Sequence, residues 1–483
     1  MRCKGAWGSV EDKSVRAKSD RFGTIVSFPE RARINGKSPA QKPLILLLQG
    51  PVGPFFRVLA TRLEAEGYDV LKVNFNGGDW SFFHGPHTLH FAGAMDAWTD
   101  WLNTFIRGRK PEAIVLFGDG RPYHRQAIAV ARLADIPVAS FEEGYVRPNF
   151  VTLEWGGNNA LSPLRHLQPP RHARGPVEPV EPVKGNLFRA MAVLAVRYYL
   201  AKAAGAVFFR GNAHHRSRGI VSESILWTRN FYRKLRYYPA NNELMLSLIE
   251  NLENQYFVVA LQVHDDQQLL RHGQGWTMER LITESIRSFK RFAAGNHHLV
   301  IKIHPMDRGH KSYRPFAVEL AHVAGCEGRV HIVDDGSIGL LIRHSLGLVT
   351  VNSTSGLLAL NHGKPILALG DAIYNGPGLS SAENRASTSG LDSFWQSAVA
   401  PDGAAVKIFN AKMREESLVN GSFYMRSLLE ATARRVVRRI QTELKIVPID
   451  DAAIVAERLQ TDRTQQPALT GAAIPSLSAD VPN

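Results

Sequence analysis

Two short motifs far apart in the chain carry residue types suited to binding a phosphate. Each closes an apolar run; they are Lys302-Ile303-His304-Pro305 and Asn352-Ser353-Thr354-Ser355-Gly356. An imidazole N–H can donate to a phosphate oxygen, and hydroxyls beside the N–H groups of a helix N-terminus favour an anion. A lone histidine is more often structural, and Ser or Thr is an ordinary helix cap. The two motifs together are more specific, and they indicate a nucleotide phosphate site.

Two adjacent carboxylates, Glu142 and Glu143, end another apolar run and meet a glycine turn. Side chains alternate in direction along a strand, so only one of the two should point into a cleft. A carboxylate there can act as nucleophile or general base in glycosyl transfer. Arg147 is suited to a substrate acid, and Glu154 adds a further carboxylate nearby. The alternative interpretation is a solvated acidic loop.

Three further turns combine glycine, amide and charged groups that suit a sugar or an acceptor. Their residues are Gln49, Gly50 and Gly53; Asn76, Gly77 and Asp79; and Asp119 and Arg121. The first turn lies where a dinucleotide fingerprint would lie, but its prolines remove backbone N–H donors, which argues against such a cofactor. Each turn could also serve only as a connection between a strand and a helix.

The elements that must position these groups follow from continuous apolar runs, which are typical of strands buried on both faces. Helical segments alternate with the runs, which predicts parallel sheets. The predicted strands are 44–48, 70–75, 113–117 and 136–141, then 256–262, 298–303, 329–333, 346–351 and 365–369. The predicted fold class is therefore α/β, with a parallel sheet in each of two halves that share one architecture. Residues past strand carboxyl ends line the ligand crevice of such sheets.

The chain of 483 residues divides into six parts by composition and pattern. We expect a flexible basic arm (1–42), an N-terminal Rossmann-like acceptor and catalytic domain (43–165) and a linker with a helical excursion (166–250). A C-terminal Rossmann-like nucleotide-sugar domain (251–400), C-terminal helices (401–459) and a disordered tail (460–483) follow. Within the excursion, 187–209 is apolar with interspersed basic residues. It fits an amphipathic helix lying on a membrane or a core or interdomain helix.

Charge and cysteine content restrict the class of protein. The 58 Lys and Arg exceed the 44 Asp and Glu, for a net charge of +14, which favours an anionic partner. Two cysteines without metal-site spacing indicate a reducing compartment and no disulfide framework. The scattered histidines match no zinc motif, so neither a metal nor another cofactor is expected. We expect no secretory signal and no transmembrane helix, and therefore a cytosolic protein.

The motifs converge on a known family. The segments 46–56 and 72–79 closely resemble the bacterial capsule polysaccharide biosynthesis proteins of the KpsS type. The acidic motif at 141–148 resembles the Glu-Glu-Gly or Glu-Asp-Gly motif of that family. The motifs at 302–305 and 352–356 resemble its His-Pro and serine-rich motifs. The similarity spans about residues 44–400, and the basic arm is not part of it.

This resemblance implies a GT-B-like fold, with two Rossmann-like domains whose parallel sheets face a cleft. It also implies a retaining β-Kdo glycosyltransferase with CMP-Kdo as donor substrate. The implied acceptor is a phosphatidylglycerol-type lipid, which receives the first Kdo of the linker for the capsule chain. By analogy His304 and Ser353 to Ser355 hold CMP, and Glu143 matches the catalytic carboxylate, with Glu142 as the other choice. The implied location is the cytoplasmic face of the inner membrane, with peripheral attachment and with other capsule biosynthesis and export proteins as partners.

Three other functions remain open from the sequence. A GT-B transferase could use another nucleotide sugar, such as a UDP-sugar. A non-catalytic scaffold of a capsule assembly complex would show the same family motifs. A nucleic-acid-binding protein is motivated only by the net charge, and no RRM, zinc-finger or KH motif supports it, so no nucleic acid partner is expected.

Overall fold

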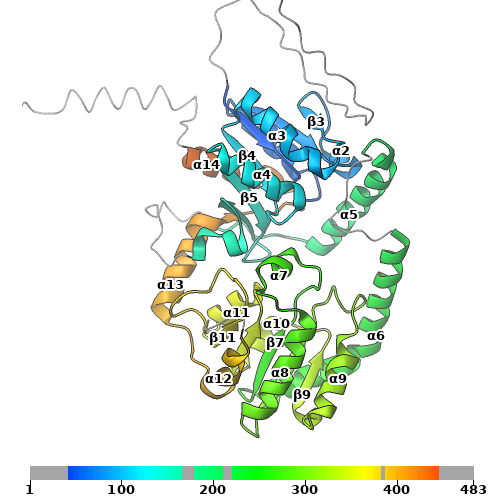
Figure 1. The fold of residues 1–483 in the computed structure, drawn as a ribbon, viewed down its shortest axis with the longest axis vertical. Helices are drawn as coiled ribbons and strands as arrows, with labels where there is room; N and C mark the ends of the chain where they lie inside the picture. The colour runs from blue at the N-terminus through cyan, green and yellow to red at the C-terminus, as the bar shows by residue number, and fades with distance from the viewer. Residues whose placement is uncertain (1–41, 166–178, 210–219, 382–386, 445–483) are drawn as a thin grey trace, which may run out of the picture.

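The protein forms two α/β domains, one above the other in Figure 1. A computed structural model describes residues 42–165, 179–209, 220–381 and 387–444. The predicted basic arm (with the single exception of Lys42) and the predicted tail lie outside these described residues, as do residues 166–178 and 210–219 of the predicted linker. The predicted fold class is confirmed, because each domain is built on a sheet of largely parallel strands.

The N-terminal domain contains a seven-stranded sheet in the order β12-β6-β5-β4-β1-β2-β3. Its strands are β1 (Leu44–Leu47), β2 (Asp69–Asn74), β3 (Thr88–His90), β4 (Ala113–Phe117), β5 (Val138–Glu143), β6 (Phe150–Trp155) and β12 (Leu418–Asn420). The first five are parallel, whereas β6 and β12 pair antiparallel at one edge. The strand order reverses between β1 and β4, which is where ligands enter an open α/β sheet.

The C-terminal domain contains a five-stranded parallel sheet in the order β11-β10-β7-β8-β9. Its strands are β7 (Tyr256–Ala260), β8 (His298–Lys302), β9 (Val330–Val333), β10 (Gly347–Thr350) and β11 (Ile366–Ala368). Successive residues of β7 belong to different apolar layers: Phe257 packs in one buried cluster and Val258 in the other. Both faces are therefore covered, which explains why these strands are continuous apolar runs.

Helices cover the faces of both sheets. Those of the N-terminal half are α1 (Phe55–Ala65), α2 (Gly77–Phe82), α3 (Met95–Arg109), α4 (Pro122–Leu133), α5 (Leu187–Ala204) and α6 (Ile220–Glu250). The others are α7 (Gln267–His272), α8 (Met278–Phe292), α9 (Tyr313–Val323), α10 (Ile338–Arg343), α11 (Ser355–Asn361), α12 (Ser389–Ser397), α13 (Gly403–Lys412) and α14 (Leu429–Leu444). Short turns of 3₁₀ helix follow β6, at Asn159–Leu161 and Pro163–Arg165.

The chain returns to the N-terminal domain near its C-terminal end, and it does so with more than the predicted helices. After α13 comes a π-helical turn, Met413–Ser417, and then strand β12, which pairs with β6. Helix α14 packs against α1 through a buried face that includes Ala433 and Val437. The N-terminal sheet is thus completed by residues from the far end of the sequence.

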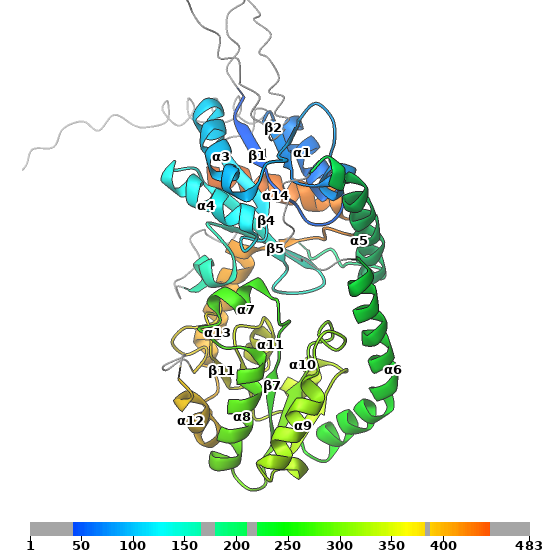
Figure 2. The same ribbon diagram turned by 45° about the vertical axis from the view of Figure 1, so that its right-hand side comes forward.

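Helices α5 and α6 lie along the same side of the molecule, α5 beside the N-terminal domain and α6 beside the C-terminal domain (Figure 2). Within the described residues, one helical stretch, Leu187–Val207, is long and apolar enough to cross a membrane, judged by length and composition only. The expectation of no transmembrane helix stays a prediction, since length and composition alone do not show a span and three basic residues interrupt the stretch. Only 6% of its apolar window is buried, so it is no core helix.

Candidate functional site at the domain junction

Loops from the carboxyl ends of both sheets meet at the junction between the domains. Gln268 donates from Nε2 to the Asp119 Oδ1 at 3.3 Å, which joins the loop after β4 to helix α7. Arg165 and Asp371 form an ion pair across the same junction, with Nη2 and Oδ1 3.1 Å apart. The strand ends that carry the predicted motifs therefore face one another, as the opposed-sheet prediction requires.

The adjacent carboxylates at the end of β5 are half-buried at this junction and have different surroundings. Burial raises the pKa of Glu142 to about 7, and the nearby charges of Glu143, Asp119 and Asp266 add to the rise. Since Asp266 belongs to the C-terminal domain, Glu142 faces that domain. Glu143 instead accepts a hydrogen bond from the hydroxyl of Tyr424.

Arg147 and His304 are close enough to influence one another across the junction. Burial lowers the pKa of His304; Asp307 opposes this, while Lys302 and Arg147 add to it. The backbone N–H of Met306 donates to His304 Nδ1 at 3.2 Å. A neutral imidazole that accepts at Nδ1 carries its proton on Nε2, which leaves an N–H donor for a ligand. Arg147 is exposed and uses Nε to bond the Gly144 carbonyl at 3.2 Å.

A second histidine fixes the loop that carries His304. His264, after β7, is 2.8 Å from Asp307 through Nδ1, and its backbone N–H donates to the other oxygen of the same carboxylate. Asp307 is buried and adds its charge near His304. This pair holds the loops after β7 and β8 together, and the sequence motifs did not predict it.

The serine-rich motif follows β10, on the other side of β7 from the His304 loop. The hydroxyls of Ser353 and Ser355 lie 2.8 Å apart, and Thr354 is exposed at the start of α11. Asn352 is held by Gln262, whose Nε2 donates to it at 2.8 Å. Gly356 is buried against Tyr374, whose ring would lie 2.1 Å from an added Cβ, so the glycine there serves packing.

Two further residues of the His-Pro motif have distinct positions. Lys302 is buried, its Nζ donates to the Ile303 carbonyl at 3.0 Å, and burial lowers its pKa to about 8. Pro305 is exposed, and its carbonyl accepts from Asn230 of α6 at 2.8 Å. Lys302 therefore supports the loop from within, whereas His304 presents a polar atom at the junction.

The predicted acceptor turns after β1 and β2 are occupied by a helix that the prediction did not place there. Tyr198 of α5 donates to Asp79 at 3.1 Å, and Gln49 and Asn76 both donate to the Tyr198 hydroxyl at 3.0 and 2.9 Å. A Cβ on Gly77 would lie 2.3 Å from the Ala201 carbonyl. These turns hold α5, so direct binding of a sugar by Asn76, Gly77 and Asp79 is a prediction that the contacts contradict.

The remaining residues of these turns line the reversal point between β1 and β4. Arg121 donates to the Gly50 carbonyl at 3.3 Å and lies over the Phe117 ring. Gly53 has a φ of +130°, which favours glycine, and it contacts Leu194 of α5. Asp119 is buried and accepts from the Asn158 backbone N–H at 2.8 Å, and burial raises its pKa.

Glu154 was predicted to bind the acceptor or the sugar, but it lies on β6 and is fully buried. Its two oxygens accept four hydrogen bonds, from the side chains of Tyr145, Asn158, Ser162 and Ser417. No oxygen is left for a substrate, because the chain folds back over the strand on both sides. The prediction that Glu154 binds a sugar was therefore wrong, and the carboxylate is structural.

Sequence reasoning also missed Tyr424 and Asp266, which flank the two carboxylates. Tyr424 lies in a segment that we expected to be helical, and 281 positions separate it from Glu143. Asp266 caps α7, where its side chain accepts from the Gln268 N–H. No local pattern marks either residue as part of the site. Within the described residues, no group of three or more His, Cys, Asp or Glu could hold a metal ion.

Fold and site together define a two-domain α/β protein in which paired carboxylates of one domain face an imidazole and hydroxyls of the other. A family model described as "Capsule polysaccharide biosynthesis protein" matches residues 112–424. The chain belongs to this family, and its sequence resemblance to the KpsS type is confirmed. Its function lies in capsule polysaccharide synthesis or modification.

Two curated relatives illustrate the match. The chain is 35% identical over 382 residues to the Capsule polysaccharide export protein KpsS of Escherichia coli, which covers 78% of this chain and 96% of the relative. It is also 35% identical over 390 residues to the Capsule polysaccharide modification protein LipB of Neisseria meningitidis serogroup A, covering 79% and 91%. Among solved structures, KpsC, a β-Kdo 2,7 transferase of Thermosulfurimonas dismutans, gives a TM-score of 0.38 at 11% identity, covering 82% and 99%.

Proposed function

We propose that this protein is a retaining glycosyltransferase that moves Kdo from CMP-Kdo to a phosphatidylglycerol-type lipid. This transfer starts the poly-Kdo linker used in capsular polysaccharide biosynthesis and export. The observation that carries the proposal is that Arg147 lies near His304, and Glu142 near Asp266, across the domain junction. Family membership supports a role in capsule synthesis, and the donor and acceptor rest on the KpsS-type sequence motifs.

The donor carries two anionic groups, and the junction offers a donor group for each. The Nε2–H of a neutral His304 suits a phosphate oxygen of CMP. The hydroxyls of Ser353 and Ser355, on the other side of β7, are further donors at the same edge of the sheet. The exposed guanidinium of Arg147 suits the carboxylate of Kdo, because it is a permanently charged, forked donor. In this arrangement the anomeric carbon lies between the phosphate site and the paired carboxylates.

In the first step, a carboxylate oxygen of Glu143 attacks the anomeric carbon, and the bond from that carbon to the CMP phosphate oxygen breaks. CMP leaves with the bonding electron pair and needs no proton, since a phosphate is a stable anion. The hydrogen bond from Tyr424 holds the attacking carboxylate in place. The product of this step is a glycosyl ester on Glu143.

In the second step, a hydroxyl of the lipid acceptor attacks the same carbon, and the ester bond to Glu143 breaks. The hydroxyl proton passes to the carboxylate of Glu142, whose pKa of about 7 suits a general base near neutral pH. Two inversions give net retention. Glu143 is thus the nucleophile and Glu142 the general base, because the two carboxylates have different surroundings.

The acceptor places the reaction at the cytoplasmic face of the inner membrane. There the protein would attach peripherally and meet other capsule biosynthesis and export proteins. No nucleic acid and no resident cofactor takes part in this scheme.

The test is a transfer assay with purified full-length protein, CMP-Kdo and a fluorescent phosphatidylglycerol analogue. We expect one Kdo added per lipid, with reaction stopped by Glu143→Gln and retained by Glu112→Gln, an exposed carboxylate at the far end of β4. Transfer from a UDP-sugar instead of CMP-Kdo would contradict the proposal that CMP-Kdo is the donor. Wild-type protein without transfer activity, together with normal capsule in cells carrying Glu143→Gln, would favour a scaffold.

A further inference from the structure

Helices α5 and α6 are arranged with polar contacts inward and apolar side chains outward. The inner face of α6 carries Asn230 and Arg233, which bond the carbonyls of Pro305 and Arg308 at 2.8 and 2.7 Å. The inner face of α5 carries Tyr198, which bonds Asp79. Surface helices of globular proteins normally show the reverse pattern.

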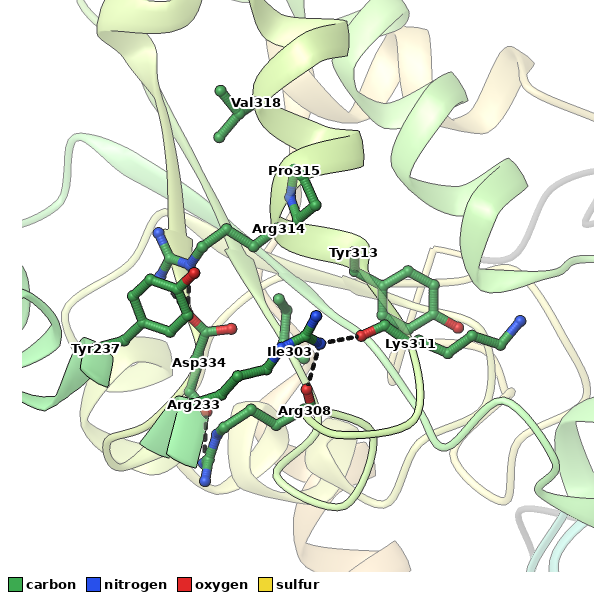
Figure 3. A pocket seen from close by; sticks show the side chains of 10 residues that line it. All are labelled: Arg233, Tyr237, Ile303, Arg308, Lys311, Tyr313, Arg314, Pro315, Val318 and Asp334. Atoms are coloured by element: carbon green, nitrogen blue, oxygen red, sulfur yellow. Dashed lines mark hydrogen bonds and ion pairs between the residues drawn. The ribbon is translucent and has the colours of Figure 1, made fainter. Parts of the chain in front are cut away.

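The inner side of α6 also lines a cavity of about 220 Å³ that is rich in charged groups (Figure 3). Arg233 and Tyr237 reach into it from α6, toward Asp334 and Arg308 of the C-terminal domain. Arg308 donates to the Asp334 carbonyl at 2.8 Å. These contacts of α6 with its domain are therefore polar, whereas its apolar packing lies further along the helix, where Met245 and Leu248 are buried.

The outward side chains form one exposed apolar surface over both helices, which we call the α5–α6 surface. Phe188, Leu200 and Phe231 are 76%, 64% and 63% exposed. The surface is represented by Phe188, Val193, Val196, Leu200, Phe231 and Leu235. Both helices lie on the same side of the molecule in both views (Figures 1 and 2). Apolar surface of this extent marks an interaction site.

The charge on the same two segments points to an anionic partner. Stretches 187–207 and 225–238 contain no Asp or Glu, and their basic residues are Arg189, Arg197, Lys202, Arg229, Arg233, Lys234 and Arg236. Exposed Tyr199, Tyr232, Tyr238 and Trp227 add aromatic groups of the kind found at membrane interfaces. A second copy of the chain is a poor partner, because a two-fold contact would set these cations against their own copies.

We propose that the α5–α6 surface docks the protein onto an anionic lipid bilayer, with both helices lying in the interface rather than crossing it. The arrangement of α5 supports lying over crossing. Its inner residues Leu194, Tyr198 and Ala201 pack on the glycine turns after β1 and β2. A crossing helix would have to give up these contacts and the hydrogen bonds of Tyr198.

Docking in this way would bring lipid to the edge of the sheets that holds the site. The turns after β1 and β2 lie at the same carboxyl edge as Glu142 and Glu143. Asn230 of α6 holds Pro305, next to His304. This step rests on the proposed lipid acceptor, whereas the docking surface itself depends on neither the donor nor catalysis.

Vesicle co-sedimentation of the full chain, without donor, tests the proposal. We expect binding to vesicles of phosphatidylcholine mixed with phosphatidylglycerol or with phosphatidylserine, and little binding to pure phosphatidylcholine. The variant V193S/V196S/L200S should lower the bound fraction by roughly tenfold or more. The control L133S/V323S/V399S removes equally exposed apolar groups from other places and should bind as wild type.

Several outcomes would overturn the docking surface. These are equal binding by both triple variants, no binding to anionic vesicles, or binding to phosphatidylglycerol only, which would report the acceptor site. A concentration-dependent dimer that the α5 variant abolishes, without vesicle binding, would assign the surface to a protein contact. Normal vesicle binding by an enzyme that fails the CMP-Kdo assay would reject the proposed function alone.

Discussion

The two sides of the domain junction present opposite chemistry on the same kind of scaffold. The N-terminal side ends β5 with Glu142 and Glu143, and it supports them with Tyr424 and the charge of Asp119. The C-terminal side ends β8 and β10 with a neutral imidazole and hydroxyls. The difference teaches that neither domain is a complete site: one holds the groups for bond making, and the other holds groups for an anion.

The largest expected effect comes from a substitution on the carboxylate side of the junction. Glu143→Gln removes the proposed nucleophile, so turnover of CMP-Kdo should fall by roughly 10³-fold or more. The measurement is initial rate with saturating donor and acceptor. Glu112→Gln is the control and should keep the wild-type rate. A Glu143→Gln enzyme that stays within tenfold of wild type would remove Glu143 from the chemistry.

Glu142→Gln should cost about 10² to 10⁴-fold, because it removes the general base of the second step. In the wild type, the rate should rise with pH up to about 7, since the carboxyl is protonated below its pKa of about 7. The pH profile of turnover measures this rise. Glu142→Gln should abolish it, and an unchanged profile in the variant would assign the titration to another group.

On the C-terminal side, His304→Ala should raise the donor KM with a smaller change in kcat. The loss in kcat/KM should be on the order of 10²-fold, as for removal of one donor to a charged oxygen. The control is His298→Ala, which changes a histidine at the opposite end of the same strand. A fall in kcat alone, with an unchanged donor KM, would contradict a role in nucleotide binding.

Tyr424→Phe should have a more modest effect, because it removes only the hydrogen bond that holds Glu143. We expect kcat to fall by about 10-fold with an unchanged donor KM, measured by steady-state kinetics. Tyr145→Phe, which removes a hydroxyl bonded to Glu154, is the matched control and should act on stability only. Equal loss of kcat in both variants would show a structural role for Tyr424.

The smallest expected effect is on the free energy of unfolding, which the buried carboxyl of Glu142 lowers as the pH rises. Its pKa is higher in the folded protein than the usual value of 4.5, so the folded state loses stability as pH rises from about 4.5 to 7. Glu142→Gln should therefore be more stable than wild type above pH 7 by about 2 kcal/mol and similar to it below pH 4.5. Chemical denaturation at pH 5 and pH 8 measures the difference, and a gain that is the same at both would contradict the assignment.

The sheets could be predicted from sequence because parallel strands buried on both faces are continuous apolar runs, as in β1 and β7. The same reasoning missed β6 and β12, which pair antiparallel at an edge and carry polar residues between apolar ones. It also placed Glu154 in a loop, although the partners that bury it include Ser417, 263 positions away. Contacts over such separations leave no local pattern.

The residues of the site also divide into those that the sequence predicted and those that it did not. Strand-end residues such as Glu143 and His304 could be found because the fold class itself places them at one edge. The groups that set their properties could not, since Tyr424, Asp266 and Tyr198 come from a terminal segment, a helix cap and an apolar helix. Asn76 and Asp79, which were predicted to bind a ligand, instead form hydrogen bonds with Tyr198 of helix α5.

The central claim is that Glu143 bonds covalently to the sugar while His304 holds the nucleotide across the junction. Peptide-mapped mass spectrometry of full-length protein, quenched soon after mixing with CMP-Kdo in the absence of acceptor, tests it most directly. The account predicts one added Kdo on the peptide that contains Glu143, absent in Glu143→Gln and greatly reduced in His304→Ala. A Kdo adduct that maps to Glu142, or one that forms unchanged in Glu143→Gln, would contradict it.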